Sequence, residues 1–113
     1  MNYNVVFHVD ETGKWELTLK NVSNLLQQID ARTAHVEVVA NAEAVTGYVL
    51  PQSPFAAALH RLNAQGVTFV ACNNALKALG IAPGSLMPFT KVVPAGVLEL
   101  IERQAKGYAY IKP

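Results

Sequence analysis

The sequence has a single cysteine, Cys72, among 113 residues, and therefore no CxxC pair. One cysteine excludes a disulfide within the chain, and scarcity of cysteine fits a reducing compartment. No apolar run approaches the roughly 18–20 residues that a transmembrane helix needs. The N-terminus has neither the basic region nor the apolar stretch of a signal peptide. We therefore expect a cytoplasmic protein that is not inserted in a membrane.

Charge is also sparse, because charged residues make up 15% of the chain and the formal net charge is +1. The nine Lys and Arg residues are scattered, so we expect neither nucleic acid nor an anionic membrane surface as a partner. The sequence contains no glycine-rich phosphate loop of either standard kind. One cysteine and three dispersed histidines form a poor ligand set, so we expect no metal and no cofactor.

Apolar residues are plentiful at 51% of the chain, which is enough for one domain, residues 1–113, with its own core. Short apolar runs predict strands over residues 3–9, 36–40, 67–71, 91–93 and 108–111. Helical spacing predicts helices over residues 15–29, 54–64 and 75–79, and a fourth that begins at 94–96 and ends before Gly107. The alternation predicts a three-layer α/β/α sandwich around a five-stranded, mainly parallel sheet.

Two segments are less regular. Residues 41–53 are compatible with a short helical turn or with a packed loop. Residues 81–89 predict an apolar loop that another subunit would cover better than water, with folding back onto the chain's own core as the alternative. In the last predicted helix, one face is apolar and the opposite, exposed side carries two i,i+4 acid–base pairs. The apolar face comprises Val97, Leu98, Ile101 and Ala105, and the pairs are Glu99–Arg103 and Glu102–Lys106.

The candidate reactive residue is Cys72, which directly follows the apolar run 67–71 and precedes the helix 75–79. At such a junction the first helix N–H groups and the helix dipole favour a thiolate and lower the thiol pKa. We therefore expect an exposed, acidified Cys72, with the backbone N–H groups of Asn73 and Asn74 facing the sulfur.

Ligands of parallel sheets bind outside the carboxyl ends of the strands. This rule gives Cys72 four expected neighbours in a binding site: His8, Asp10, Asn41 and Glu43. His35 and His60 are expected elsewhere. Other interpretations stay open, since a lone cysteine is often a packed core residue and a histidine on a buried strand is often a satisfied core side chain. Asp10 and Glu43 could equally be solvated or partner-binding loop acids.

A single activated thiol is suited to carry a group, and a persulfide carrier needs only a nucleophilic thiolate and hydrogen-bond donors near the terminal sulfur. No arginine lies near Cys72 in the sequence, and Lys77 comes a helical turn later. Sulfur taken from a partner protein's persulfide therefore fits better than sulfur taken from an oxyanion such as thiosulfate.

Three segments resemble the DsrE/DsrF-like superfamily, and in particular its small, largely uncharacterised bacterial and archaeal branch: residues 69–81, 92–97 and 107–111. The resemblance implies the same parallel sandwich. It also implies relay of sulfane sulfur on a cysteine at the position of Cys72, and assembly as homotrimers or as hexamers with related chains. The sequence departs from the sulfur-relay members at residues 41–53 and in having Asn73-Asn74 after the cysteine.

The first hypothesis is therefore a sulfur-relay protein that carries a persulfide on Cys72, with donor and acceptor proteins as partners and, if it is an enzyme, a sulfurtransferase-type activity. The alternative is a small oligomeric binding or regulatory module without sulfur transfer, in which Cys72 is only packed. A third hypothesis is an enzyme that uses Glu43, His8 or Asp10.

Overall fold

The computed structural model describes residues 2–113 and contains one sheet of five strands. The strands are β1 (Tyr3–Val9), β2 (Ala34–Ala40), β3 (Thr68–Cys72), β4 (Lys91–Val93) and β5 (Ala109–Ile111). Their order is β4-β3-β2-β1-β5, and every neighbouring pair is parallel. The predicted α/β fold is confirmed, and the sheet is entirely parallel. All five carboxyl ends therefore lie at one edge.

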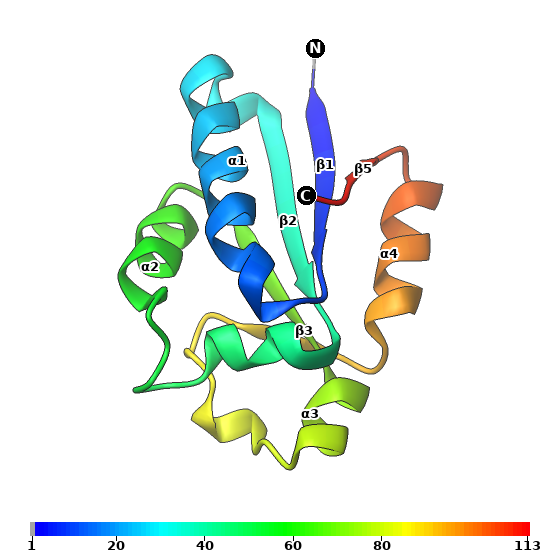
Figure 1. The fold of residues 1–113 in the computed structure, drawn as a ribbon. Coiled ribbons are helices and arrows are strands. Elements are labelled where there is room, and N and C mark those ends of the chain that lie inside the picture. Colours follow the sequence, from blue (N-terminus) through cyan, green and yellow to red (C-terminus); the bar gives the residue numbers. More distant parts are fainter. Residues whose placement is uncertain (1) are drawn as a thin grey trace.

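Helices cover both faces of this sheet. They are α1 (Trp15–Gln28), α2 (Ala56–Ala64), α3 (Asn73–Leu79) and α4 (Gly96–Ala105). Figure 1 shows α1 and α2 on one side of the strands, α4 on the other side, and α3 beyond the carboxyl end of β3. No helix within residues 2–113 is long and apolar enough to span a membrane.

The two layers of core are unequal. Alternate residues of a strand point to opposite faces of the sheet, so β1 sends Val5, Phe7 and Val9 toward α1 and Val6 toward α4. The α1–α2 side buries the large aromatic side chains of the core. The α4 side contains only a small cluster: Val6, Val39, Val70, Val93 and Leu100.

The undecided segment 41–53 forms a buried 3-10 helix, η3 (Ala42–Tyr48), which packs at the carboxyl end of the sheet. Two aromatic side chains hold it there. The indole Nε1 of Trp15 donates a hydrogen bond to the Ala44 carbonyl at 2.7 Å, and the Tyr48 hydroxyl donates to the Val70 carbonyl at 3.0 Å. Complete burial raises the pKa of Tyr48 well above its usual value, so the phenol stays neutral and remains a donor.

The apolar loop 81–89 folds back onto the same chain. It contains a 3-10 turn, η4 (Pro83–Ser85), and the Met87 N–H donates to the Tyr48 carbonyl at 2.9 Å. Leu86 and Met87 are buried in the main core. The prediction that this loop needs a second subunit to cover it is therefore wrong for both side chains.

Helix α4 presents the opposite face from the one expected. Its Glu99 and Leu100 pack on the sheet, whereas Val97 is 61% exposed and Ile101 57% exposed. The prediction that Glu99 and Arg103 lie on the exposed side is thus wrong, since Glu99 is only 6% exposed. Helical spacing defines two faces of a helix but does not tell which of them meets the sheet.

Gly47 provides a test of how η3 is packed. A Cβ at Gly47 would clash with the Trp15 indole, lying 2.7 Å from Cε2, and the indole is fixed by its bond to Ala44. We expect Gly47→Ala to lower the free energy of unfolding by about 1–3 kcal/mol through overpacking. Gly84→Ala is the control, because nothing lies within 4 Å of a Cβ there. Urea unfolding followed by circular dichroism measures both variants, and equal stabilities would contradict the packing described.

Candidate functional site

The structure places Cys72 at the last position of β3, where it is also the N-cap residue of α3. Its backbone is extended, with φ −74° and ψ 118°, and the helix begins at the next residue. Asn73 and Asn74 are the first two residues of α3. The backbone N–H groups of this first turn have no partners within the helix. The strand-to-helix junction expected from the sequence is therefore present at the cysteine.

A second helix begins against the same cysteine. A Cβ built on Gly96, the first residue of α4, would lie 3.2 Å from the Cβ of Cys72 and 3.3 Å from the Cβ of Asn41. These distances are shorter than ordinary Cβ contacts, so a residue without a side chain suits the close approach of the α4 backbone to the strand ends. Cys72 and Asn41 thus lie side by side under the start of α4. The cysteine has the N-termini of both α3 and α4 next to it.

This close approach leaves little of the cysteine accessible. Cys72 is 7% exposed and packs with Ala71, Ala75 and Leu76 in the main core. Its side chain forms no capping hydrogen bond to α3. The prediction of an exposed thiol is therefore wrong for a single chain, because the start of α4 covers the carboxyl end of β3.

His8 and Asn41 are brought together, as the sequence predicted for this edge of the sheet. His8 Nε2 lies 3.0 Å from Asn41 Oδ1, and His8 Nδ1 lies 2.6 Å from the hydroxyl of Tyr110 on β5. The amide oxygen only accepts, so Nε2 carries the proton and donates to it, while Nδ1 accepts from the tyrosine. With both ring nitrogens occupied, His8 is not free to act as the base of a Cys-His hydrolase.

Asp10 and Glu43 have other partners. The Lys112 ammonium lies 3.1 Å from Asp10 Oδ1, and the Thr12 backbone N–H donates to Glu43 Oε2 at 3.0 Å. This backbone hydrogen bond lowers the pKa of Glu43 below its usual value. Both acids hold loop segments at the sheet edge, and no hydrogen bond within residues 2–113 links either of them to Cys72, Asn41 or His8.

Sequence reasoning missed three polar residues on the α4 side. Tyr110 was seen only as part of a strand, and its contact with His8 depends on β5 lying next to β1, which no spacing reveals. Glu37 and Glu99 are both buried between the sheet and α4. The one available signal was Glu37 itself, a charged residue inside the apolar run 36–40.

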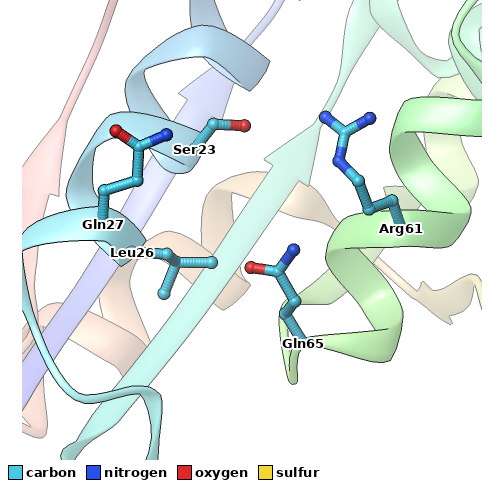
Figure 2. Close-up of a pocket in the computed structure, with 5 residues that line it drawn as sticks. All are labelled: Ser23, Leu26, Gln27, Arg61 and Gln65. Carbon is cyan, nitrogen blue, oxygen red and sulfur yellow. The ribbon is translucent and has the colours of Figure 1, made fainter.

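Cavities in the surface lie elsewhere. A cleft of about 320 Å³ lies between α1 and α2. Figure 2 shows the side chains that line it: Ser23, Leu26, Gln27, Arg61 and Gln65. A more apolar groove of about 520 Å³ runs beside β1 and β5, and its lining includes Tyr3, Phe7, Leu25 and Ile111. Cys72, His8 and Asn41 line neither cavity. Within residues 2–113 no three His, Cys, Asp or Glu side chains are placed to share a metal ion.

Comparison with known proteins agrees with this fold. The model of the DsrE/DsrF-like family matches residues 4–113. The solved structure of MTH1491, a protein of unknown function from Methanobacterium thermoautotrophicum, is 35% identical, with a TM-score of 0.91, over 99% of this chain and 100% of that one. The ychN protein of E. coli is 17% identical, with a TM-score of 0.84 and full coverage of both chains, and shows the same fold. No curated protein matches.

Tyr110→Phe tests the hydrogen-bonded chain that runs from β5 through His8 to Asn41. The variant removes the donor to His8 Nδ1, and we expect a loss of about 0.5–1.5 kcal/mol in the free energy of unfolding. Tyr3→Phe is the matched control, because Tyr3 is 41% exposed. Nitrogen-15 NMR of the imidazole should also show the Nε2–H tautomer in the wild type, and an Nδ1–H tautomer would contradict the assignment.

Proposed function

We propose that this chain, which belongs to the DsrE/DsrF-like family, relays sulfur as a persulfide on Cys72. The family is associated with sulfur relay in general, and Cys72 is the chain's only thiol. The observation that supports the proposal best is the position of this thiol at the N-terminus of α3 and beneath the N-terminus of α4.

Two helix N-termini beside one sulfur favour its anionic forms. Each helix start exposes backbone N–H groups and the positive end of the helix dipole, which stabilise a nearby negative charge. The α4 N-cap is Ala95, whose methyl group cannot occupy those N–H groups as a Ser or Asp side chain would. These N–H groups are therefore available as donors to a sulfur carried on Cys72.

The transfer step needs no redox cofactor. The Cys72 thiolate attacks the terminal sulfur of a donor persulfide, R–S–SH, and a new S–S bond forms while the donor's S–S bond breaks. The donor leaves as the thiolate RS⁻, and the proton stays with the transferred sulfur to give Cys72–S–SH. Attack by an acceptor thiolate on that terminal sulfur reverses the step and regenerates Cys72.

Burial of Cys72 sets a condition on this chemistry. The thiol is 7% exposed, so a donor reaches it only when part of the surrounding structure moves away, and the first turn of α4 lies against the residue at Gly96. When closed, the same turn shields the persulfide from water and from small reductants. A partner protein that displaces α4 would therefore control both loading and release.

The direct test is intact-mass analysis after incubation with glutathione persulfide. We expect the wild-type protein to gain the mass of one sulfur atom, and dithiothreitol to remove it, because a persulfide is reducible. Cys72→Ser is the control and should gain nothing. If the wild type gains no sulfur, even when Cys72 can be alkylated under the same conditions, the chain would instead be a binding or regulatory module with a packed cysteine.

The expected homo-oligomer, a trimer or hexamer, is a further part of the proposal, and the α4 surface supports it. The exposed face of α4 carries Val97, Leu98 and Ile101, and apolar side chains gathered on one helix are typical of an interface. The flanking Glu102 and Lys106 form no ion pair with each other within residues 2–113, contrary to the sequence prediction. A second copy of the chain offers both the apolar face and the opposite charge to each.

Light scattering coupled to gel filtration tests this assembly. We expect Ile101→Gln to shift the protein toward the monomer, because it places a polar side chain in the apolar contact. Leu17→Gln on α1 is the matched control, since Leu17 is 43% exposed and lies on another helix. The charge reversals Glu102→Lys and Lys106→Glu should each weaken the assembly, and their combination should restore it. A wild type that is monomeric at all concentrations would refute the assembly.

A further inference from the structure

Two carboxyl groups and one guanidinium are enclosed between the sheet and α4. Glu37 projects from β2 and is 7% exposed, and Glu99 projects from α4 and is 6% exposed. Arg103, one turn after Glu99, places its Nε 3.6 Å from Glu99 Oε2. Neither the proposed sulfur chemistry nor the hydrogen bonds around His8 use these three side chains. Buried ionisable groups are costly unless their charges and hydrogen bonds are balanced.

The carboxyl groups of Glu37 and Glu99 can bond to each other only if they share a proton. Glu37 Oε2 and Glu99 Oε2 are buried and have no hydrogen-bond partner, and neither has Arg103 Nε. Ionised carboxylates only accept, so two of them cannot bond to each other, whereas one proton between them makes an O–H···O bond. With that proton the pair carries a single negative charge, which the Arg103 guanidinium neutralises.

The surroundings of Glu37 favour the protonated state. Burial, followed by the hydrogen bond and the negative charge of Glu99, raises the pKa of Glu37 to about 8. Arg103 and Lys91 on β4 act in the opposite direction. Tyr108 lies against the Arg103 guanidinium, 5.5 Å from ring centroid to Cζ, and across the sheet Tyr48 is a neutral phenol.

A small cavity borders Glu37, on the β2 side of the pair. It has a volume of about 60 Å³ and is lined by His35, Glu37, Thr68 and Tyr108, with Val36 and Gly66. This volume is polar and large enough for water. Water in the cavity would give the Glu37 carboxyl a route for exchanging its proton with solvent, so the protonation state can follow the external pH without unfolding of the domain.

We propose that Glu37 and Glu99 form a proton-controlled latch that holds α4 on the sheet. With one shared proton the two carboxyl groups bond to each other and α4 lies over Cys72. Loss of that proton leaves two facing negative charges, which Arg103 and Lys91 only partly offset, and α4 separates from the sheet. The latch does not depend on sulfur transfer, but if Cys72 carries a persulfide, the latch sets when the sulfur is accessible.

The direction of the pH dependence follows from proton binding. The folded latch holds its proton up to a pH of about 8, whereas the free carboxyl of an opened or unfolded chain loses it near 4.5. The closed state is therefore favoured fully below pH 4.5, and this advantage is lost progressively as the pH rises to about 8. In that window one proton is released on opening, so the opening equilibrium rises by up to about tenfold per pH unit.

Glu37→Gln separates the latch from other effects of pH. The glutamine amide has nearly the shape of the acid and donates an N–H to Glu99 at any pH. We expect amide hydrogen exchange of α4, corrected for the intrinsic effect of pH, to accelerate steeply between pH 6 and 8 in the wild type and to stay nearly flat in the variant. Glu16→Gln on α1, where the carboxyl is exposed, is the control and should behave as the wild type.

Two further measurements keep the proposal falsifiable if Glu37→Gln folds poorly. Glu99→Gln changes the other carboxyl group of the latch, and it should also make amide hydrogen exchange of α4 nearly independent of pH. Carbon-13 NMR of the wild-type side-chain carboxyls should show one glutamate titrating near pH 8, as the raised pKa of Glu37 requires. A wild type in which every glutamate titrates in the ordinary acidic range, or whose α4 exchange does not depend on pH beyond the intrinsic effect, would overturn the latch. Persulfide loading, measured separately by mass, is not needed for either result.

Discussion

The arrangement of this protein depends on one close backbone contact, between Gly96 at the start of α4 and the side chains of Cys72 and Asn41. Because glycine has no Cβ, the first turn of α4 lies directly on the carboxyl ends of β2 and β3. The contact adds a second helix N-terminus to the cysteine and removes it from solvent. It thereby links the reactivity proposed for Cys72 to whatever controls the position of α4.

The link between Cys72 and the position of α4 matters because of the side chains that hold α4 on the sheet. Besides the contact at Gly96, its sheet-facing side contributes Leu100 to a small apolar cluster and buries Glu99 near Glu37. Apolar burial would stabilise the helix regardless of pH, whereas enclosed carboxyl groups make its attachment conditional on a proton. An attachment that depends on pH would allow α4 to move and expose the Cys72 thiol. The apolar side chains Val97, Leu98 and Ile101 lie on the exposed face of α4 instead.

The sequence was sufficient for the architecture, because β-branched runs, helical spacing and the Gly80 C-cap all agree along the stretch from β3 through α3. It could not give the order of the strands, and the pairing of Tyr110 with His8 depends on that order. Sequence reasoning also chose the wrong sheet-facing side of α4, because that side depends on the contact with Glu37 on β2. The packing of residues 41–53 could not be predicted either, because it depends on the position of the Trp15 indole.

The pairing of β1 with β5 joins the two ends of the chain, with Val5 beside Ala109. Closing a loop of that length has an entropic cost, and the ladder that closes it has only three residue pairs. This ladder should therefore be among the last elements to form during folding and the first to fray under stress. When this ladder frays, Tyr110 loses its contact with His8. Local unfolding of β5 would therefore change the candidate site while the core around Phe69 is still folded.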